Sequence, residues 1–542
     1  MFNYSKIQSV SQSKLNSKVK IDLALKNASV TNTSHDNGDE EEYEKSMVAP
    51  YAGSFHKLLP HDSNGQISKD SYELLLKAIH SGKQHDFDQL SLFDNSLNQL
   101  ADPQASLNYC LMGIDNSSVQ SLTPPGINTP HAAVEMIENY CKELCRDIPF
   151  SNWQNDSTIS KVIGYMNQTD VLNAYHGPTS NGQVTLQNLF RGNNHGYEDG
   201  PYISQLLYQD FPYGALLIEQ KYKVPKEKSQ SSVPVDFGVS KSRMIAIQNG
   251  IEDESSPERF QENTKYLYNG RALAEAVHND PLYQFYYNAA LILLNLGCPC
   301  DDGFKGGINE KTFTSNGGPA DILHHVANIS GLALKHAWFH KWQVHRRIRP
   351  EGFSLLVHNQ KENVTGFNYI NHLLINHPVL DDIRQLHIDY YNESSYTLSS
   401  VFPEGSPTHP AYPAGHAVVA GACATILKIF FQADLSWEQF ATVVEANNDG
   451  TQLVNYNGDV SNMTINSEIN KLAGNISLGR DWANVHYRSD GDWGNLIGEE
   501  LAIHYMKDVL NTYNQTYNGE MPILTLEKFD GSIIKIKANI IP

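Results

Sequence analysis

The sequence is poor in cysteine, in charge and in long apolar runs. Its six cysteines among 542 residues are too few for a scaffold built from disulfides. Charged residues make up only 18% of the chain, and 60 acidic against 40 basic side chains leave a formal net charge of -20. This charge argues against nucleic acid or a membrane surface as a partner, because both attract clustered positive charge. No stretch reaches the ~18 apolar residues of a membrane-spanning helix, so we expect a soluble protein.

The cysteines do not form a pattern typical of a metal site. They are Cys110, Cys141, Cys145, Cys298, Cys300 and Cys423. The two close pairs lack a second pair at the spacing of a zinc site, and Cys423 falls in an apolar segment. We interpret all six as ordinary thiols. A local disulfide within Cys141/Cys145 or Cys298/Cys300 stays open.

The N-terminal region has the composition of an arm. Residues 1–47 are polar and end in an acidic run, Asp36–Glu44, so we predict an extended or disordered segment rather than core. The first twenty residues contain no acidic residue and no apolar stretch of the kind found in signal peptides. No secretory signal is predicted, and the compartment stays open.

Most of the remaining chain has apolar residues at helical spacing. The periodic segments are Ala132–Cys145, Arg271–Leu296, Ala320–Trp342, Asn368–Ile375, His416–Phe431, Trp437–Asn447 and Trp493–Tyr513. We predict a mainly α protein of large helical-bundle architecture, with two four-helix-bundle-like halves at 48–225 and 261–520. The stretch 226–260 is rich in Ser and Lys and lacks periodicity, which indicates a loop or insertion between the halves.

A small β element is predicted at the C-terminal end, in residues 521–542. Two stretches with alternating apolar residues, Ile523–Leu526 and Ile533–Ile536, flank the pair Asp530-Gly531. Asp-Gly between such stretches is typical of a β-hairpin turn.

A basic cluster stands out in this acidic chain at His340–Pro350. Its cationic residues are Lys341, Arg346, Arg347 and Arg349. Pro350 disfavours helix at Arg349, so we place Lys341 and Arg349 about two turns apart at the C-terminal end of one helix. Cations there gain ~0.3–1 kcal/mol from the helix dipole alone. Alternatively, Lys341 supplies a point charge and Arg349 a planar fork to an oxoanion.

A proline-rich loop, Ser406–Pro413, leads into the apolar segment that begins near His416. His416 is therefore predicted at a helix N-terminus, where backbone N–H groups attract anions and the imidazole pKa is lowered. Gly415 would allow close approach of the backbone. A glycine-histidine pair that merely caps a helix is the structural alternative.

A third motif contains Arg480, His486 and Asp490. If this stretch is helical, His486 and Asp490 share a face. A carboxylate beside an imidazole fixes its tautomer and raises the basicity of the other nitrogen, as a metal ligand or a nucleophile requires. The alternative is a surface ion pair beside a core histidine.

Together and in this order, the three motifs resemble the active-site pattern of the vanadium-dependent haloperoxidases, which the type 2 phosphatidic-acid phosphatases and bacterial acid phosphatases share. The resemblance is closer to the algal and cyanobacterial bromoperoxidases and extends from about residue 48 onward. It includes the longer phrases Tyr51–Pro60, Asp210–Ala215, Lys341–Arg346 and Glu404–Pro410.

The resemblance implies a role for each residue that matches the pattern. His486 would be the metal ligand, the axial nitrogen of vanadate, with Asp490 beside it. Lys341, Arg349 and Arg480 would donate to the equatorial oxygens.

The resemblance also implies roles for residues of the proline-rich loop and of the segment that follows it. Gly415 would contribute its backbone N–H, and His416 would bond the apical oxygen and relay protons. His409 matches a histidine that bromoperoxidases carry where chloroperoxidases have an aromatic residue, which implies bromide or iodide as substrate.

The implied activity is oxidation of bromide or iodide by hydrogen peroxide to hypohalous acid, which halogenates small organic acceptors. The implied cofactor is vanadate, without haem, acting as a Lewis acid at constant oxidation state. The resemblance also implies a large homo-oligomer of helical subunits, so we expect this chain to assemble with itself into a dimer or a larger oligomer, up to a dodecamer. We expect neither nucleic acid nor a membrane as a partner.

Position 414 departs from the family pattern, because Ala414 stands where the resemblance predicts serine. A neutral hydrogen bond is worth ~0.5–1.5 kcal/mol, whereas loss of a preorganised donor can cost ~10²–10³ in rate. We therefore expect vanadate binding to survive, whereas the rate and the peroxide or halide preference stay open. Whether Ala414 is natural or engineered stays open.

Two other functions use the same residues. An acid phosphatase would employ His486 as nucleophile, oriented by Asp490, and His416 as the acid for the leaving group. A non-catalytic oxoanion-binding protein would need only the cationic shell. Trp342, His409 and the longer phrases favour the haloperoxidase.

Overall fold

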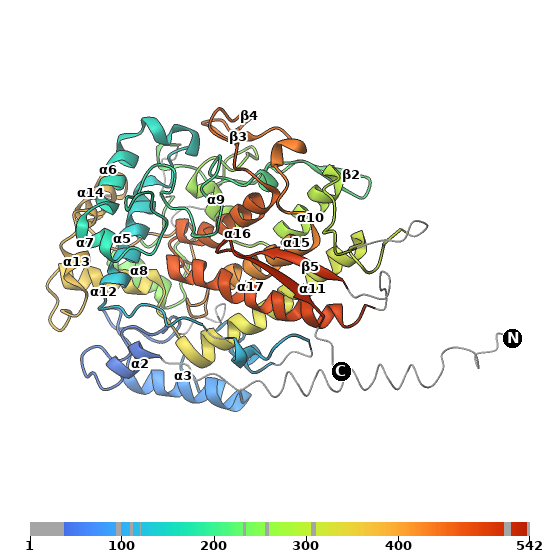
Figure 1. Cartoon of the computed structure of the whole chain (residues 1–542). Helices are drawn as coiled ribbons and strands as arrows, with labels where there is room; N and C mark the ends of the chain where they lie inside the picture. Colours follow the sequence, from blue (N-terminus) through green and yellow to red (C-terminus); the bar gives the residue numbers. More distant parts are fainter. Residues whose placement is uncertain are drawn as a thin grey trace.

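The structure is a computed structural model that describes residues 37–93, 99–108, 112–119, 121–230, 235–254, 259–304, 311–513 and 522–538 (Figure 1). Cys110 and residues 1–36 of the predicted arm lie outside these ranges. The other five cysteines are free thiols, so neither close pair forms a disulfide. Within the described residues, no helix is both long and apolar enough to cross a membrane.

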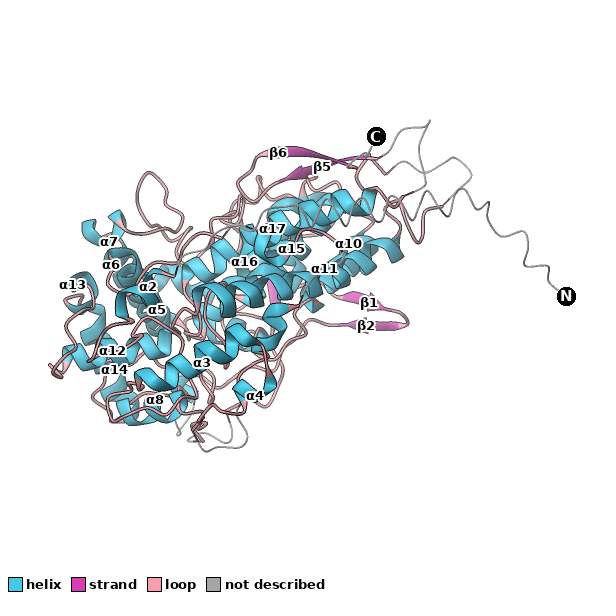
Figure 2. Cartoon of the chain, turned by 90° about the horizontal axis from the view of Figure 1, so that it is seen from below, coloured by secondary structure: helices cyan, strands magenta, loops and turns pink. Residues whose placement is uncertain are grey.

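The helices form two groups, which Figure 2 separates clearly. One group holds α10 Gln284–Leu296, α11 Pro319–Phe339, α15 Gly415–Phe430, α16 Ile465–Trp482 and α17 Arg488–Leu510. The other holds α5 Pro130–Cys145, α6 Ser157–Met166, α7 Thr169–Asn173, α8 Lys241–Gln248, α12 Pro350–Lys361, α13 His372–Ile375 and α14 Val379–Tyr391. Because α13 and α14 pack against α5, the two groups do not coincide with the predicted sequence halves.

Helix α15 is the centre of the first group and packs against α11, α16 and α17. Its residues are almost all apolar and small, and two glycines set the spacing to α17. A Cβ on Gly421 would lie 2.1 Å from the backbone oxygen of Asn495, and one on Gly498 would lie 2.2 Å from that of Val418. Side chains at these positions would force the helices apart, so the sequence here requires glycine.

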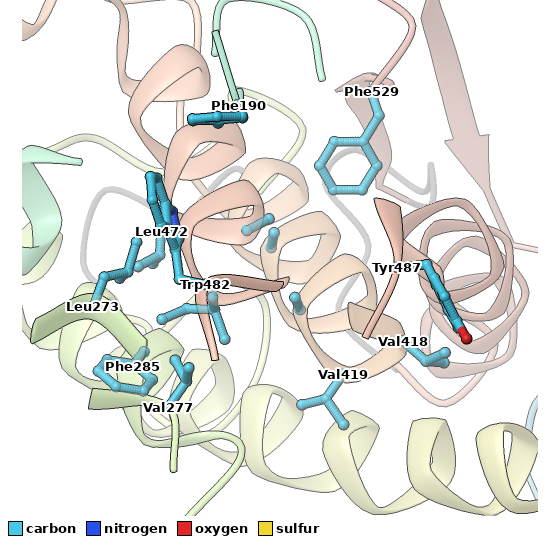
Figure 3. Close-up of a cluster of buried hydrophobic side chains, with 14 of the residues drawn as sticks. Phe190, Leu273, Val277, Phe285, Val418, Val419, Leu472, Trp482, Tyr487 and Phe529 are labelled. Carbon is cyan, nitrogen blue, oxygen red and sulfur yellow. The ribbon is translucent and has the colours of Figure 1, made fainter. Parts of the chain in front are cut away.

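Fully buried apolar side chains form the core around α15 and α16. Val418 and Val419 of α15 and Leu472 and Trp482 of α16 are fully buried, and Figure 3 shows them among aromatic and aliphatic neighbours. The Trp482 ring meets Phe190 edge to face at 5.2 Å. Burying each large side chain contributes ~1.5–3 kcal/mol, so this core fixes the end of α15 that carries His416 and the end of α16 that carries Arg480.

The remaining helices are short or peripheral. They are α2 Gly38–Tyr43, α3 Lys69–Ser81, α4 Gln84–Phe87 and α9 Gly270–Ala276. Short 3-10 turns lie at Pro103–Leu107, Asn116–Ser118, Phe150–Asn155, Gln205–Leu207, Lys228–Gln230 and Trp437–Gln439.

Three small antiparallel hairpins complete the described fold. They are β1 Phe211–Tyr213 with β2 Leu216–Ile218, β3 Val444–Ala446 with β4 Leu453–Asn455, and β5 Ile523–Glu527 with β6 Ile533–Lys537. The last confirms the predicted C-terminal hairpin. Its apolar face, Leu524, Leu526 and Ile536, is buried against α15 and α17 (Figure 2).

The predicted helices at Ala132–Cys145, Ala320–Trp342, His416–Phe431 and Trp493–Tyr513 are confirmed as α5, α11, α15 and α17. The predicted helix Trp437–Asn447 is wrong, because only Trp437–Gln439 turns and the chain then enters β3. The predicted helix Arg271–Leu296 is broken into α9 and α10 by a segment that contains Asp280 and Pro281. A proline cannot occupy a helix interior without losing a backbone hydrogen bond.

Two predicted irregular regions contain folded helices. In the predicted arm, α2 buries Glu40 and Tyr43. In the predicted loop 226–260, α8 buries Met244 and Ile247. Both helices are too short for a periodic signal to be recognised in the sequence, and tertiary contacts stabilise them instead.

Candidate active site

Lys341 and Arg349 lie on two different elements and not on one helix as predicted. Helix α11 ends at Phe339 and continues as a π-helical turn, His340–His345, that carries Lys341. Arg346 then adopts a left-handed conformation with φ 38°, which turns the chain away from the helix axis. Arg349 is the N-cap of α12. A helix N-terminus disfavours a cation, so the dipole explanation fails for Arg349.

Both cations are buried and donate to uncharged acceptors. The Nζ atom of Lys341 lies 2.6 Å from the backbone oxygen of Pro410 and 2.8 Å from that of Ala411. The Nε atom of Arg349 donates to the backbone oxygen of His409 at 2.9 Å. Another Arg349 nitrogen, Nη1, donates to the backbone oxygen of Val485 at 2.7 Å. These bonds fix the positions of the two charges without neutralising them.

His486 lies in the loop between α16 and α17, between a cation and a carboxylate. Its Nε2 is 2.9 Å from Nη1 of Arg349, and its Nδ1 is 2.8 Å from Oδ2 of Asp490. Because a guanidinium only donates, Nε2 accepts and Nδ1 carries the proton that is donated to Asp490. Asp490 is in the first turn of α17. The predicted pairing is therefore confirmed, although the two residues do not share one helix.

His416 is in the first turn of α15, as predicted, and its Nε2 lies 2.8 Å from Oδ1 of Asp280. The Nε2 nitrogen donates to that carboxylate, which leaves Nδ1 as the basic nitrogen. Burial lowers the pKa of His416 despite the nearby Asp280. The sequence interpretation missed Asp280. The Asp280-Pro281 interruption of an apolar run was the signal that could have located it.

Arg480 projects from the last turn of α16. Its Nη1 donates to the backbone oxygen of Val277 at 2.5 Å, and its guanidinium lies 5.4 Å from the ring centroid of Phe402. Its Nε is buried without a hydrogen-bond partner among the described residues. The Phe402 ring and the Val277 carbonyl thus position a guanidinium that retains donors for a ligand.

His409 completes this cluster on the side of Arg349. Its Nδ1 lies 2.9 Å from Nη2 of Arg349, and its ring packs against Trp338 with centroids 4.8 Å apart. Burial, together with the Lys341 and Arg349 charges, holds the pKa of His409 well below its usual range. The imidazole is therefore neutral and accepts a hydrogen bond from Arg349.

Ala414 and Gly415 form the backbone wall of the site. Ala414 is the N-cap of α15, provides no side-chain cap, and donates its own N–H to the backbone oxygen of Asp490 at 3.0 Å. The first N–H groups of a helix have no acceptor within that helix, so those of Gly415 and His416 are available to an anion. A Cβ on Gly415 would lie 3.3 Å from the Trp338 ring.

The charges of the site favour the binding of an anion. Lys341, Arg349 and Arg480 form no ion pair within the described part of the chain. Burial and the neighbouring Arg349 hold the pKa of Lys341 well below its usual range. Burial also lowers the pKa of Arg349 to about 9 and that of Arg480 to about 10. Three clustered, desolvated cations without a counterion are unfavourable, and an oxoanion between them would remove that cost.

The same donor set argues against a site for a bare metal cation. Among the residues that the structure describes, no three carboxylate, thiolate or imidazole groups gather to hold a metal ion. Burial and the surrounding cations hold the pKa of His486 well below its usual range, so its Nε2 is a neutral donor. One imidazole facing three cations fits a metal that arrives as an oxoanion, such as vanadate.

Comparisons with known proteins agree with this geometry. Residues 333–515 match the family model described as the second helical-bundle domain of VCPO. A vanadium-dependent bromoperoxidase of Ascophyllum nodosum is 30% identical over 498 residues, which cover 90% of this chain and 86% of the relative. One from Corallina pilulifera is 29% identical over 579 residues, covering 92% and 93%.

A solved structure agrees over nearly the whole chain. It is the homohexameric second vanadate-dependent bromoperoxidase of Ascophyllum nodosum, with a TM-score of 0.90 and 26% identity. The match covers 99% of this chain and 92% of that one. With a relative 30% identical along most of both sequences, this chain belongs to the family of vanadium-dependent bromoperoxidases.

Proposed function

We propose that this chain is a vanadate-dependent haloperoxidase that oxidises bromide or iodide with hydrogen peroxide. The observation that carries the proposal is the set of three buried cations, Lys341, Arg349 and Arg480, that lack a carboxylate partner in the described structure and surround the neutral Nε2 of His486. The balanced reaction is H₂O₂ + Br⁻ + H⁺ → HOBr + H₂O. It consumes one proton, so the site needs a group that delivers protons.

Each residue would hold the oxoanion through a distinct kind of contact. Lys341, Arg349 and Arg480 would donate to its oxygens, and Gly415 would add a backbone N–H. His486 would provide Nε2 as the single nitrogen ligand. Its Nδ1–H bond to Asp490 orients the ring and strengthens Nε2 as a donor. When bound, vanadium(V) would supply Lewis acidity toward the peroxide, and the reaction would need no haem.

His416 is suited to the proton transfers. Asp280 holds its Nε2–H, so Nδ1 can accept a proton and later return it. Lys341 donates two of its three N–H groups to the backbone oxygens of Pro410 and Ala411, and the third would be left to donate to an oxygen of the bound oxoanion. A preorganised donor of this kind is worth ~10²–10³ in rate.

His409 is the residue we assign to halide preference. It presents a neutral, half-buried imidazole beside Arg349 and Trp338, where chloroperoxidases carry an aromatic ring. An imidazole leaves this part of the pocket more polar, which favours bromide or iodide over chloride. Small organic molecules would then accept the oxidised halogen.

Assembly with further copies is proposed from the relative that was solved as a homohexamer. Light scattering on the purified protein would determine the number of copies.

The experiment that tests the function compares two reactions of one preparation. Vanadium-free protein is incubated with orthovanadate, hydrogen peroxide and bromide, and bromination of a dye is followed. Bromination that requires all three reagents supports the proposal. Release of nitrophenol from nitrophenyl phosphate without any bromination would instead establish the phosphatase reaction of the same pocket.

A further inference from the structure

The connection between α9 and α10 contacts the oxoanion site at two places. The backbone oxygen of Val277 accepts a hydrogen bond from Nη1 of Arg480 at 2.5 Å. Three residues later, Oδ1 of Asp280 lies 2.8 Å from Nε2 of His416. His278 lies between these two residues in the sequence, and neither contact uses its side chain.

The rings of His278 and Phe402 are stacked face to face. Their centroids are 3.7 Å apart and their planes differ by 4°, so the imidazole covers one face of the Phe402 ring and leaves no room there for another group. The guanidinium carbon of Arg480 lies 5.4 Å from the centroid of the same ring and therefore approaches its other face or its edge. Phe402 thus links the imidazole of His278 to the guanidinium of Arg480.

Both rings of this stack are held in place. Phe402 is fully buried, and its N–H donates to Oγ of Ser400 at 3.0 Å. Each ring nitrogen of His278 faces a carboxylate, because Nε2 is 2.5 Å from Oε1 of Glu404 and Nδ1 is 3.3 Å from Oε1 of Glu275. These contacts fix the orientation of the imidazole, and the imidazole in turn restricts rotation of the Phe402 ring.

Arg480 depends on packing more than the other guanidinium of the site does. Arg349 makes four hydrogen bonds, two to backbone oxygens and two to imidazole nitrogens. Within the described residues, Arg480 makes one, to Val277, and its buried Nε has no partner. A single hydrogen bond leaves a guanidinium free to rotate about that bond. The Phe402 ring supplies the second constraint, and a cation beside an aromatic ring is also attracted by it.

The backbone of the connection does not depend on the His278 side chain. The N–H of Val277 donates to the backbone oxygen of Ala274 at 3.3 Å, and that of His278 donates to the backbone oxygen of Glu275 at 3.1 Å. Both hydrogen bonds remain when the side chain at position 278 is shortened. The Val277 carbonyl would then stay in place, while Phe402 would lose the ring that packs against it.

We propose that His278 is a positioning residue for the oxoanion site and orients Arg480 through the ring of Phe402. The inference rests on that part of the proposed function that places an oxoanion beside Arg480. The flat ring of His278 carries the effect, since the ring, and not its charge, is in contact with Phe402. Phenylalanine at position 278 would preserve the stack, because two aromatic rings also pack favourably.

The experiment measures oxoanion binding to the full-length, vanadium-free protein, so it does not depend on turnover. The probes are orthovanadate, by equilibrium dialysis, and inorganic phosphate, by titration calorimetry. His278→Ala removes both the ring and the ion pair, whereas His278→Phe removes the ion pair and keeps a ring. His504→Ala is the matched control, because it removes another histidine–glutamate pair, with Glu500 at 2.9 Å. That pair lies about 21 Å along α17 from Asp490.

We expect the affinities for vanadate and phosphate to fall about three- to thirtyfold in His278→Ala, the range for loss of a buried cation–aromatic contact. His278→Phe and His504→Ala should bind both anions like the parent protein. Denaturant unfolding should show a loss of stability in both His278 variants, since both lack the ion pair. Parent-like affinity in His278→Ala, or an equal loss of affinity in His278→Ala and His278→Phe, would overturn the proposal.

A double-mutant cycle tests whether Phe402 transmits the effect. Phe402→Leu alone should weaken vanadate binding by about three- to thirtyfold as well. Adding His278→Ala to Phe402→Leu should weaken it no further, because the ring through which His278 acts is already gone. Losses that multiply in the double variant would show that His278 acts by another route and would refute the proposed link.

The two proposals fail in different ways. A parent protein that binds neither vanadate nor phosphate would refute the proposed function and, with it, the positioning role. Binding that weakens in His278→Ala, in a parent protein that does not oxidise bromide, would refute the peroxidase reaction and support the role of His278. Bromide oxidation together with parent-like vanadate affinity in His278→Ala would refute the positioning role alone.

Discussion

Two kinds of buried cation occur within the short segment from Lys341 to Arg349. Arg346 forms a two-pronged ion pair with Glu40 at 2.6 and 2.7 Å, and Arg347 is paired with Glu135 at 2.7 Å and Asp490 at 2.8 Å. Lys341 and Arg349 are equally buried, yet donate to carbonyl groups and imidazoles.

The pKa values follow this difference. Burial alone would lower the pKa of Arg347, but the carboxylates of Glu135 and Asp490 raise it above its usual value. Burial lowers the pKa of Lys341 and Arg349, where no carboxylate compensates in this way. Cations paired with carboxylates, such as Arg347, therefore connect parts of the fold. Buried cations without a carboxylate, such as Lys341 and Arg349, are unfavourable until an anion binds beside them. Within one motif, some residues thus stabilise the fold and others bind the anion.

The largest loss of activity is expected at His486, which lies among the unpaired cations Lys341, Arg349 and Arg480. His486→Ala removes the Nε2 atom that faces Arg349, together with the ring that Asp490 orients through Nδ1. We expect bromination to be abolished and vanadate affinity to fall by more than the ~10–100-fold that loss of an outer partner costs. Dye bromination and equilibrium dialysis measure the two effects. Full bromination by His486→Ala would show that the ligand assignment is wrong.

Substitution of a paired cation, Arg346, should lower the stability of the protein and leave vanadate binding unchanged. Arg346→Met leaves Glu40 buried without its cation, which costs ~3–5 kcal/mol of folding free energy. Denaturant unfolding of the vanadium-free protein measures this loss. Vanadate affinity of the folded variant should match that of the parent. A variant as stable as the parent would contradict the structural role of this pair.

The matched substitution of an unpaired cation, Arg349→Met, should affect vanadate binding more than it affects stability. Arg349→Met removes two charge-assisted donors, each worth ~1.5–3 kcal/mol, so vanadate affinity should fall by at least ~10²-fold. The vanadium-free protein should lose less stability than it does in Arg346→Met, because the desolvated charge that is removed offsets the lost hydrogen bonds to His409 and Val485. Unfolding curves and vanadate titrations of Arg346→Met and Arg349→Met measure the stability and the vanadate affinity of the two variants. Equal behaviour of Arg346→Met and Arg349→Met would break the comparison.

Ala414 offers a smaller change at the helix N-terminus beside the cations. Ala414→Ser provides a side-chain cap for α15, where there is none, and should stabilise the protein by ~1 kcal/mol. It also adds a hydroxyl donor toward the oxoanion, so turnover should rise without a comparable change in vanadate affinity. Thermal unfolding and kcat measure the two effects, and a serine variant that is neither more stable nor faster would contradict this role.

The smallest effect is expected at a half-exposed ion pair, His278 with Glu404. Neighbouring carboxylates raise the pKa of His278 against the opposing effect of burial, and His278 lowers that of Glu404 against the same effect. The His278 contribution is complete below its unfolded pKa of ~6.5 and is lost as pH rises through the raised value. The Glu404 contribution is complete above ~4.5 and is lost as pH falls through the lowered value.

Glu404→Gln should therefore cost most stability between about pH 4.5 and 6.5. Solvent screening limits the cost to less than ~1 kcal/mol. Thermal unfolding across pH for the variant and its parent measures the difference. A cost that grows steadily above pH 8 would contradict this assignment of charges.

Much of the site could be predicted from the sequence, because its residues lie in short motifs with strong constraints on their order. His416 at a helix N-terminus followed from the prolines and glycine before an apolar run. The pairing of His486 with Asp490 followed from their spacing, although a helix start, and not a continuous helix, brings them together. The C-terminal hairpin followed from Asp530-Gly531.

What the sequence could not reveal depends on contacts between distant segments. Asp280 reaches His416, and Phe402 reaches Arg480, across more than a hundred and almost eighty residues respectively. The buried helix α16 contains many polar residues, such as Asn470 and Asn475, whose amide N–H groups donate to neighbouring segments of the chain. Its pattern therefore lacks the apolar stripe that identifies a surface helix. The left-handed Arg346 also separates Lys341 from Arg349 without any glycine to signal the turn.

The most direct test of the unpaired cations is a vanadate titration of the vanadium-free protein, followed by thermal unfolding. We expect one vanadate per chain, competition by phosphate, and stabilisation of about 2.7 kcal/mol at a concentration of vanadate one hundred times Kd. Arg346→Met should show the same stabilisation from its lower starting point, and His486→Ala little of it. An unfolding temperature that vanadate leaves unchanged in the parent protein would contradict an oxoanion site built from Lys341, Arg349 and Arg480.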